Sequence, residues 1–197
     1  MKVILFNAPP NSGKTYSSEW LREELHDSLG GFVKVTNQAF ADPVNKAVKS
    51  FFSLSEEQFE ELATREMKEV KQESLGFRSL REARIWLAED LIKPRVGRDF
   101  FAAEVYDGFE RGWAVNIVHD LGFKEELKVM TDNVPHKNIL VVRICAEGTN
   151  YEGDSRSPVK VPESVEVLEW ENRKDEESLN ELWSEVVAWL HSEEGIL

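Results

Sequence analysis

Eight residues near the start of the chain have the order of a phosphate-binding loop. They read Ala8-Pro9-Pro10-Asn11-Ser12-Gly13-Lys14-Thr15 and depart from the pattern G-x-x-x-x-G-K-[ST] only in having Ala8 at the first glycine. In such a loop backbone N–H groups surround a phosphate, the lysine reaches the outer phosphates, and the Ser/Thr hydroxyl binds Mg²⁺. The pattern predicts a nucleoside triphosphate site made by Asn11, Ser12, Gly13, Lys14 and Thr15.

The flanking sequence favours this interpretation over a chance Gly-Lys-Thr in a turn. Val3 to Phe6 is a short apolar strand, and residues 13–29 carry apolar side chains at helical spacing before Gly30-Gly31. A phosphate loop needs this strand and this helix, because the N-terminus of the helix attracts an anion. Ala8 is the weak point: a positive φ there would strain its methyl group, whereas an extended backbone would accept it.

Further strands and helices alternate along the chain and predict an α/β fold. Strands are expected at residues 32–36, 114–118, 139–144 and 165–170. Helices are expected over residues 55–73, 100–109 and 123–130. Another is expected to begin at Asp42-Pro43, and another to run from a capping box formed by Ser79 and Glu82 to Pro94. A last helix is expected at the end of the chain, where one face carries Leu179, Leu182, Trp183, Val186 and Leu190. We expect a mostly parallel five-stranded sheet flanked by helices, in the three-layer fold of P-loop NTPases.

Length and composition favour one globular domain without a membrane span. The chain has 197 residues, of which 41% are hydrophobic and 31% charged, and no apolar run approaches the ~18 residues that a membrane helix needs. Met1-Lys2 leads directly into the first strand, so no secretory signal is expected. The single Cys145 suits a reducing compartment. These features predict a cytoplasmic protein.

The net charge of −13 is unevenly distributed along the chain. Residues 163–197 hold eleven acids against two bases, a net charge of −9, which leaves −4 for the rest. Residues 78–98 hold six bases against three acids. Long nucleic acid is a poor partner for a chain without an extended basic face, but the local basic segment offers a place for a small anion.

Five short motifs beyond the phosphate loop follow one another in a characteristic order. They are Phe40-Ala41-Asp42-Pro43 before a helix, Arg81-Glu82-Ala83 before Trp86-Leu87, Gly97-Arg98-Asp99-Phe100-Phe101, His119-Asp120-Leu121-Gly122-Phe123 at a strand end, and Gly153-Asp154-Ser155-Arg156-Ser157. In this order they resemble the deoxynucleoside monophosphate kinases of tailed bacteriophages, over residues 2–157.

The resemblance implies a single kinase domain over residues 1–197. It would contain a helical acceptor-binding insertion at about residues 40–112 and a lid at about residues 147–158. The implied reaction transfers the γ-phosphoryl group of ATP, with Mg²⁺, to a deoxynucleoside 5′-monophosphate, in the host cytoplasm if the gene belongs to a phage. A monomer and a homodimer both remain open, as do the accepted bases.

Three residues are candidates for the transfer step itself. Lys14 would stabilise the transferring charge, and Arg156 in the lid would close over the phosphates, unless it is an exposed arginine paired with Asp154. Asp120 would hold Mg²⁺ through water beside Thr15, or would cap the helix that follows. No catalytic histidine is expected, because a phosphate monoester is already a nucleophile at neutral pH.

Candidates for the acceptor site come from the basic segment and its neighbours. Arg81, with Arg78 and Arg84 at three-residue spacing, would contact the acceptor phosphate or form a solvated face. One of Arg95 and Arg98 would bind phosphate from a loop, or both would lie in an exposed turn. Asp42 would contact the acceptor or cap a helix; Phe40 and Trp86 would stack on a base or belong to the core.

Two other functions remain open at this point. A P-loop kinase for another small metabolite would keep Lys14 and Thr15 but bind a different acceptor. A nucleotide-binding switch with slow hydrolysis would need a residue that positions water, and the sequence offers no evident glutamine or glutamate motif for this purpose.

Overall fold

A computed structural model describes residues 1–152 and 157–192. The chain forms two compact units, which we call the sheet unit (Met1–Phe40 and Tyr106–Leu197) and the helical unit (Ala41–Val105). Among the described residues no helix combines the length and the apolar character needed to cross a membrane.

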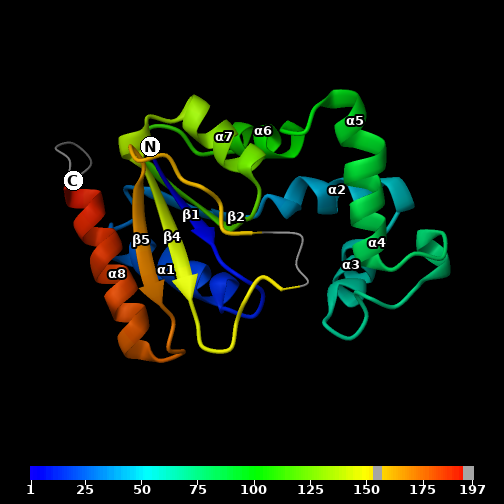
Figure 1. Ribbon diagram of the computed structural model, residues 1–197, viewed down its shortest axis with the longest axis horizontal. Helices are drawn as coiled ribbons and strands as arrows, with labels where there is room; N and C mark the ends of the chain where they lie inside the picture. Colours follow the sequence, from blue (N-terminus) through cyan, green and yellow to red (C-terminus); the bar gives the residue numbers. More distant parts are fainter. Residues whose placement is uncertain (153–156, 193–197) are drawn as a thin grey trace. The chain divides into compact units, whose positions relative to one another are not determined.

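The sheet unit is built on a parallel sheet of five strands in the order β2-β3-β1-β4-β5 (Figure 1). The strands are β1 (Lys2–Asn7), β2 (Lys34–Gln38), β3 (Ala114–Leu121), β4 (Ile139–Cys145) and β5 (Glu166–Glu171). This confirms the predicted α/β class. Because β1 is central and its side chains are buried on both faces, it reads as a continuous apolar run.

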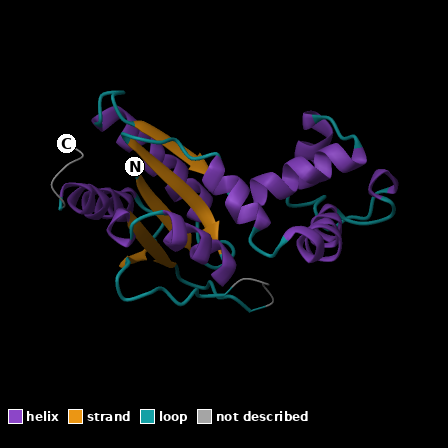
Figure 2. Cartoon of the chain, turned by 90° about the horizontal axis from the view of Figure 1, so that it is seen from above, coloured by secondary structure: helices purple, strands orange, loops and turns teal. Residues whose placement is uncertain are grey.

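Helices α1 (Lys14–Ser28) and α8 (Glu176–His191) pack on one face of the sheet. Ile4 and Phe6 of β1 share a core with Leu21 of α1 and Leu182 of α8. Helix α7 (Lys124–Asn133) and the short η3 (His136–Asn138) connect β3 to β4. Helices lie on both sides of the strands in Figure 2, as the three-layer prediction requires.

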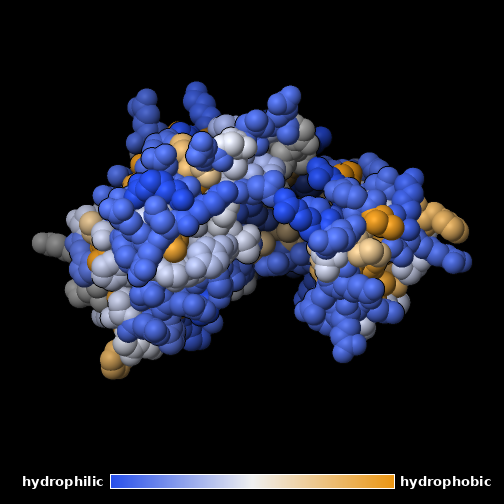
Figure 3. Space-filling model, turned by 90° about the horizontal axis from the view of Figure 1, so that it is seen from below, coloured by the Kyte–Doolittle hydropathy of each residue, from blue (hydrophilic) through white to orange (hydrophobic). Residues whose placement is uncertain are grey.

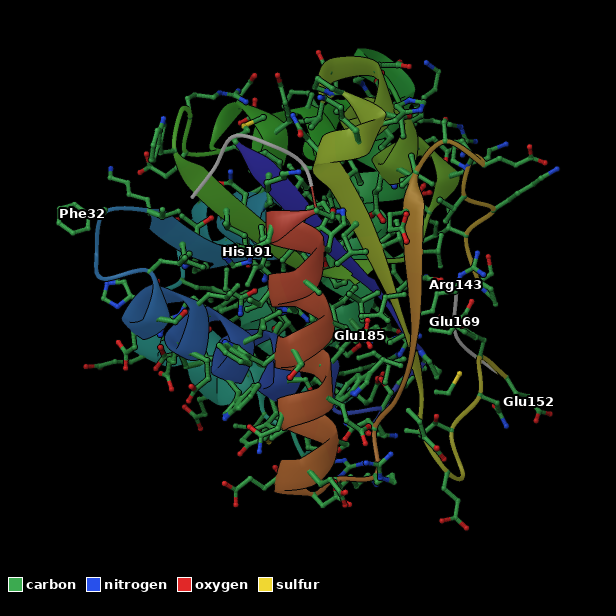
Figure 4. The ribbon with its side chains drawn as sticks, turned by 90° about the vertical axis from the view of Figure 1, so that its left-hand side faces the viewer. Phe32, Arg143, Glu152, Glu169, Glu185 and His191 are labelled. Atoms are coloured by element: carbon green, nitrogen blue, oxygen red, sulfur yellow. The ribbon has the colours of Figure 1, made fainter. Side chains whose placement is uncertain are left out.

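An ion pair joins the edge strand β5 to its neighbour β4. Arg143 of β4 and Glu169 of β5 lie 3.0 Å apart, and Figure 4 shows them on the two adjacent strands. The same figure shows α8, with Glu185 and His191 labelled, lying along the sheet. The predicted apolar face of this helix is confirmed, since Leu179, Leu182, Val186 and Leu190 are buried.

The helical unit has a small core of its own. Its helices are α2 (Ala41–Phe52), α3 (Glu56–Ala63), η1 (Glu73–Leu75), α4 (Leu80–Ile85), the π-helix η2 (Trp86–Ile92), α5 (Lys93–Val96) and most of α6 (Phe100–Asp107). Val48, Leu75, Leu80 and Leu87 are among its buried residues. Helix α4 begins at the predicted capping box, in which the hydroxyl of Ser79 accepts the N–H of Glu82 and the Glu82 carboxylate accepts the N–H of Ser79.

Several predicted boundaries in the helical unit are wrong. The helix expected over 55–73 ends at Ala63. Pro94 does not stop its helix, because it lies in the first turn of α5, where a missing N–H is tolerated, and the helix ends at Gly97. Helix α2 begins at Ala41, one residue before Asp42, which lies in its first turn.

Strand boundaries in the sheet unit also differ from the prediction. Strand β2 begins at Lys34 rather than Phe32, because Gly30 and Gly31 have positive φ and Phe32 belongs to the exposed turn that follows. Strand β3 continues to Leu121, past the polar pair His119-Asp120 that marked its expected end. The strand therefore carries both polar side chains to the carboxyl edge of the sheet.

Candidate functional site

The predicted phosphate loop joins β1 directly to α1. Asn11 and Gly13 have left-handed backbone conformations, with φ of 62° and 85°. Asparagine and glycine are the residues that adopt this conformation most readily. Alternation of left- and right-handed residues curls a chain so that its N–H groups face one concave side, which binds anions. The chain thus has the strand, loop and helix of a P-loop fold.

Ala8 causes no backbone strain in this loop. It is absent from the described residues with positive φ, so its backbone does not have the conformation that would strain a methyl group. Its side chain is 3% exposed and belongs to the core shared by β1, α1 and α8. The departure from the glycine pattern therefore places a methyl group in the core.

Lys14 folds back over the loop. Its Nζ lies 3.4 Å from the carbonyl oxygen of Ala8 and 3.5 Å from that of Pro9. Both distances are long for a charge-assisted hydrogen bond, so an incoming phosphate can compete for the ammonium group. The side chain is held near the N-terminus of α1, where the helix dipole also favours an anion.

Hydroxyl groups around the loop lack protein partners. Ser12 and Ser17 are fully buried, and their Oγ atoms have no hydrogen-bond partner in the described part of the chain. The Thr15 side chain is exposed, and none of the described residues hydrogen-bonds its hydroxyl. Buried polar atoms are nearly always satisfied, so both serine hydroxyls can accept a further polar partner at the loop.

A hydrogen-bonded chain connects the ends of β2 and β3 with α1. The amide oxygen of Asn37 lies 3.1 Å from Nδ1 of His119, and its Nδ2 donates to Oγ of Ser18 at 3.1 Å and to Glu19 at 2.8 Å. Ser18 Oγ donates to the carbonyl oxygen of Thr15. Because the Asn37 oxygen must accept, Nδ1 of His119 carries the proton. Sequence analysis left His119 without a role.

Glu19 at the end of this chain stays ionised at neutral pH. Arg22 donates to its carboxylate at 2.7 Å, and this bond, followed by the bond from Asn37, lowers the pKa of Glu19. A carboxylate held in this way is a poor proton acceptor. Glu19 therefore orients Asn37 and is unsuited to act as a general base.

Asp120 ties the chain after β2 to the end of β3. Its Oδ1 accepts the backbone N–H of Phe40 at 2.6 Å. Asp120 is not the helix cap that was the alternative, because the carboxylate of Glu126 accepts the N–H groups of Gly122 and Phe123 ahead of α7. The Mg²⁺ role of Asp120 stays a prediction.

Asn172, just after β5, is a loop contact that sequence analysis missed. Its Nδ2 donates to the carbonyl oxygen of Ser12 at 2.8 Å, and the side chain is 5% exposed. The two residues are 160 positions apart, so local spacing gives no signal of this contact. The segment after β5 therefore reaches the phosphate loop.

Arg84 differs from the other arginines of the helical unit. Its guanidinium carbon lies 5.3 Å from the centre of the Phe59 ring, and its Nε is buried without a partner among the described residues. Burial lowers the pKa of Arg84, and no carboxylate of the described chain pairs with it. A desolvated cation of this kind is a binding group for an anion.

The other predicted arginines have different surroundings. Arg81 is half-exposed and pairs with Glu69 at 3.5 Å. Arg95 is exposed and donates to the carbonyl oxygen of Leu91 at 2.5 Å. Arg98 is exposed and makes no hydrogen bond or ion pair within residues 1–152 and 157–192. The structure therefore offers Arg84 and Arg98 as uncommitted cations.

The predicted aromatic residues lie in different environments. Phe40 is 3% exposed, which supports core packing rather than stacking on a base. Trp86 is partly buried, with the Phe51 ring at 5.3 Å and the Arg78 guanidinium at 4.6 Å from its own ring. Hydrophobic patches interrupt the hydrophilic surface of the helical unit in Figure 3. Phe51 and Ile85 belong to this unit and are half-exposed.

The remaining candidates are Asp42 for the acceptor and the residues of the expected lid. Asp42 is exposed in the first turn of α2. Arg156 lies outside the described residues, with 153–155 of the expected lid. The described remainder of that segment, 147–152 and 157–158, contains neither helix nor strand.

The chain is similar to known proteins in structure but not in sequence. No protein-family model matches the sequence, and no curated protein sequence matches it. Among solved structures, the crystal structure of Chaetomium thermophilum Kti12 in complex with ADP-AlF3 is similar, with a TM-score of 0.47 and 11% sequence identity. The likeness covers 94% of this chain and 97% of that chain. The fold of the present chain is defined by its own strand order and phosphate loop.

Proposed function

We propose that the protein transfers the γ-phosphoryl group of Mg-ATP to a deoxynucleoside 5′-monophosphate. The observation that carries the proposal is the loop between β1 and α1, with left-handed Asn11 and Gly13, the ammonium of Lys14 folded over it, and two orphaned hydroxyls. In a phosphate-binding loop, backbone N–H groups and the lysine are the groups that receive the phosphates of a nucleotide.

In the proposed step an oxygen of the acceptor phosphate forms a bond to the γ-phosphorus. The bond from that phosphorus to the β–γ bridging oxygen breaks, and ADP leaves with the electron pair on this oxygen. Lys14 stabilises the charge on the transferring group. When bound, Mg²⁺ supplies positive charge to the β- and γ-phosphates, and the exposed, uncommitted hydroxyl of Thr15 fits it as a ligand, with Asp120 acting through water.

A general base is not needed for this reaction. The acceptor phosphate is already ionised near neutral pH, so alignment and charge neutralisation are the main tasks of the protein. His119 and Glu19 both hydrogen-bond to Asn37. This arrangement supports a role in holding α1 rather than in proton transfer.

The acceptor phosphate would bind to arginines of the helical unit. Arg84 is the best supported, because it is desolvated and lacks a carboxylate partner in the described chain. Arg81, Arg95 and Arg98 remain candidates from the resemblance to the phage kinases, as does Trp86 for the base. An anion at Arg84 would neutralise its charge and form charge-assisted hydrogen bonds.

A screen of acceptors tests the proposal. ADP release from Mg-ATP would be followed with each deoxy- and ribonucleoside monophosphate in turn, and with Lys14→Ala protein as the blank. We expect ADP release to rise strongly with at least one deoxynucleoside monophosphate and to be slow without an acceptor, because a kinase that excludes water from its bound substrates hydrolyses little ATP. Equal ATP hydrolysis with and without acceptor would instead identify a hydrolytic switch, and activity only with an unrelated metabolite would identify another P-loop kinase.

A further inference from the structure

We infer that Asn172 is a positioning residue that orients the phosphate loop to receive the nucleotide. This inference rests on the proposed function, since it concerns how the same loop binds the phosphates of ATP. Asn172 follows the last strand, far in sequence from the loop, and its amide group is one of the few buried polar side chains of the sheet unit.

Three hydrogen bonds fix Asn172 in place. Its backbone N–H donates to the carbonyl oxygen of Cys145 at 2.8 Å, which extends the pairing of β5 with β4. Its Oδ1 accepts the N–H of Lys174 at 2.9 Å, and Lys174 has a left-handed φ of 61°. Its Nδ2 then points at the loop and donates to Ser12 at 2.8 Å. The sheet thus provides a rigid support for one loop carbonyl.

Holding the carbonyl of Ser12 also orients the N–H of Gly13. In a trans peptide the C=O and the following N–H point in opposite directions. Because the Ser12 oxygen is directed at Asn172, the Gly13 N–H is directed away from Asn172, and it donates to no acceptor in the described part of the chain. Asn172 therefore presets one of the backbone donors that a phosphate would bind.

The approach of Asn172 also explains why Gly13 must lack a side chain. A Cβ at Gly13 would lie 2.4 Å from Nδ2 of Asn172, closer than real contacts allow, and the φ of 85° would strain any L-residue. Glycine at this position thus serves two purposes: it adopts the backbone conformation, and it admits the amide that holds Ser12.

Nucleotide affinity tests the inference. Asn172→Asp keeps the size of the side chain and the acceptor for Lys174 but removes the donor to Ser12. We expect it to weaken Mg-ATP binding about tenfold in calorimetry, the equivalent of one hydrogen bond of roughly 1.4 kcal/mol. Asn133→Ala is the matched control, because Nδ2 of Asn133 also donates to a backbone carbonyl at 2.8 Å, at the end of α7. Asn133→Ala should leave the affinity for Mg-ATP within about twofold of the wild-type value.

Wild-type affinity in Asn172→Asp would overturn the inference, and the Lys14→Ala variant tells whether the proposed function falls with it. If Lys14→Ala abolishes binding while Asn172→Asp does not, the nucleotide site stands and only the positioning role is wrong. If the wild-type protein binds no Mg-ATP, both fail.

A double-mutant cycle measures the contact without nucleotide. Gly13→Ala should lower the unfolding temperature more in the wild-type background than in the Asn172→Ala background, because removing the amide relieves the clash and leaves only the strain of positive φ. An equal fall in unfolding temperature in the two backgrounds would show that the Asn172 amide does not contact position 13 of the loop. This result would overturn the inference independently of nucleotide binding.

Discussion

The phosphate loop and the arginine-bearing helices would bind anions by different means. In the loop the backbone would supply most of the binding groups, and closely spaced residues such as Asn11 and Gly13 set their directions. In the helical unit the candidate binding groups are side chains, and Arg81 and Arg84, three residues apart, have different partners and burial. A local motif is therefore enough to predict the residues of a phosphate loop. For the helical unit it predicts only the region, and not which arginine would bind the anion.

The largest expected effect tests the loop. Lys14→Ala should lower phosphoryl transfer by about two to three orders of magnitude, because the ammonium stabilises charge that develops in the transition state. Steady-state ADP release at saturating acceptor would measure it. Unfolding temperatures of both proteins would confirm that the variant is folded.

Lys128→Ala is the matched control for this prediction. Lys128 is exposed on α7 and pairs with Asp132 in the same helix, so its removal takes one ammonium from the sheet unit without touching the loop. Surface ion pairs of this kind contribute little to stability. A Lys14→Ala protein that is folded and nearly as active as Lys128→Ala would contradict the role of the loop.

The second-largest effect is expected from removing the buried guanidinium of Arg84 in the helical unit. Arg84→Met keeps an apolar stem against Phe59 but removes the guanidinium. We expect kcat/KM for the nucleoside monophosphate to fall about ten- to a hundredfold, equivalent to a charge-assisted contact of roughly 1.5–3 kcal/mol, with little change in the KM for ATP. The unfolding temperature should be unchanged or higher, because a desolvated cation without a carboxylate partner in the described chain is removed.

Arg81→Met is the companion variant on the same helix. Arg81 is predicted to contact the acceptor from its resemblance to a family motif, yet its ion pair with Glu69 competes for the guanidinium. We therefore expect Arg81→Met to raise the acceptor KM by a smaller factor than Arg84→Met. The reverse order would mean that the family motif identifies the phosphate ligand better than burial and pairing do.

Much of the fold and the phosphate loop could be predicted because their signals are local. Strand β1, helix α1, the Ser79/Glu82 cap of α4 and the apolar face of α8 follow from periodicity and spacing over a few residues. The contact of Asn172 with Ser12 joins distant segments, and the burial of Arg84 depends on Phe59 from another helix. Neither leaves a local pattern.

The continuation of the helix past Pro94 is another feature that a local sequence pattern does not predict. Proline is a reliable helix breaker when the residue before it continues regular α-helical turns. Here the π-helix η2 precedes it, and Pro94 lies in the first turn of α5. The distinction depends on backbone hydrogen bonding, which residue types alone do not specify.

The smallest expected effect concerns the position at which the loop departs from the glycine pattern. Ala8→Gly would restore the pattern, and a comparison based on the motif alone would predict an improvement. The structure predicts a loss of stability of about 1–2 kcal/mol, because a buried methyl group is removed and the unfolded chain becomes more flexible. Thermal unfolding would measure this as a fall of a few degrees, while the affinity for Mg-ATP should stay within about twofold, since Ala8 already has no positive φ. If Ala8→Gly instead tightened ATP binding about tenfold, the methyl group of Ala8 would be restricting the loop. The conformation of the loop backbone would then depend on Ala8 as well as on Asn11 and Gly13, and the local motif would describe this site less fully than the comparison with the helical unit implies.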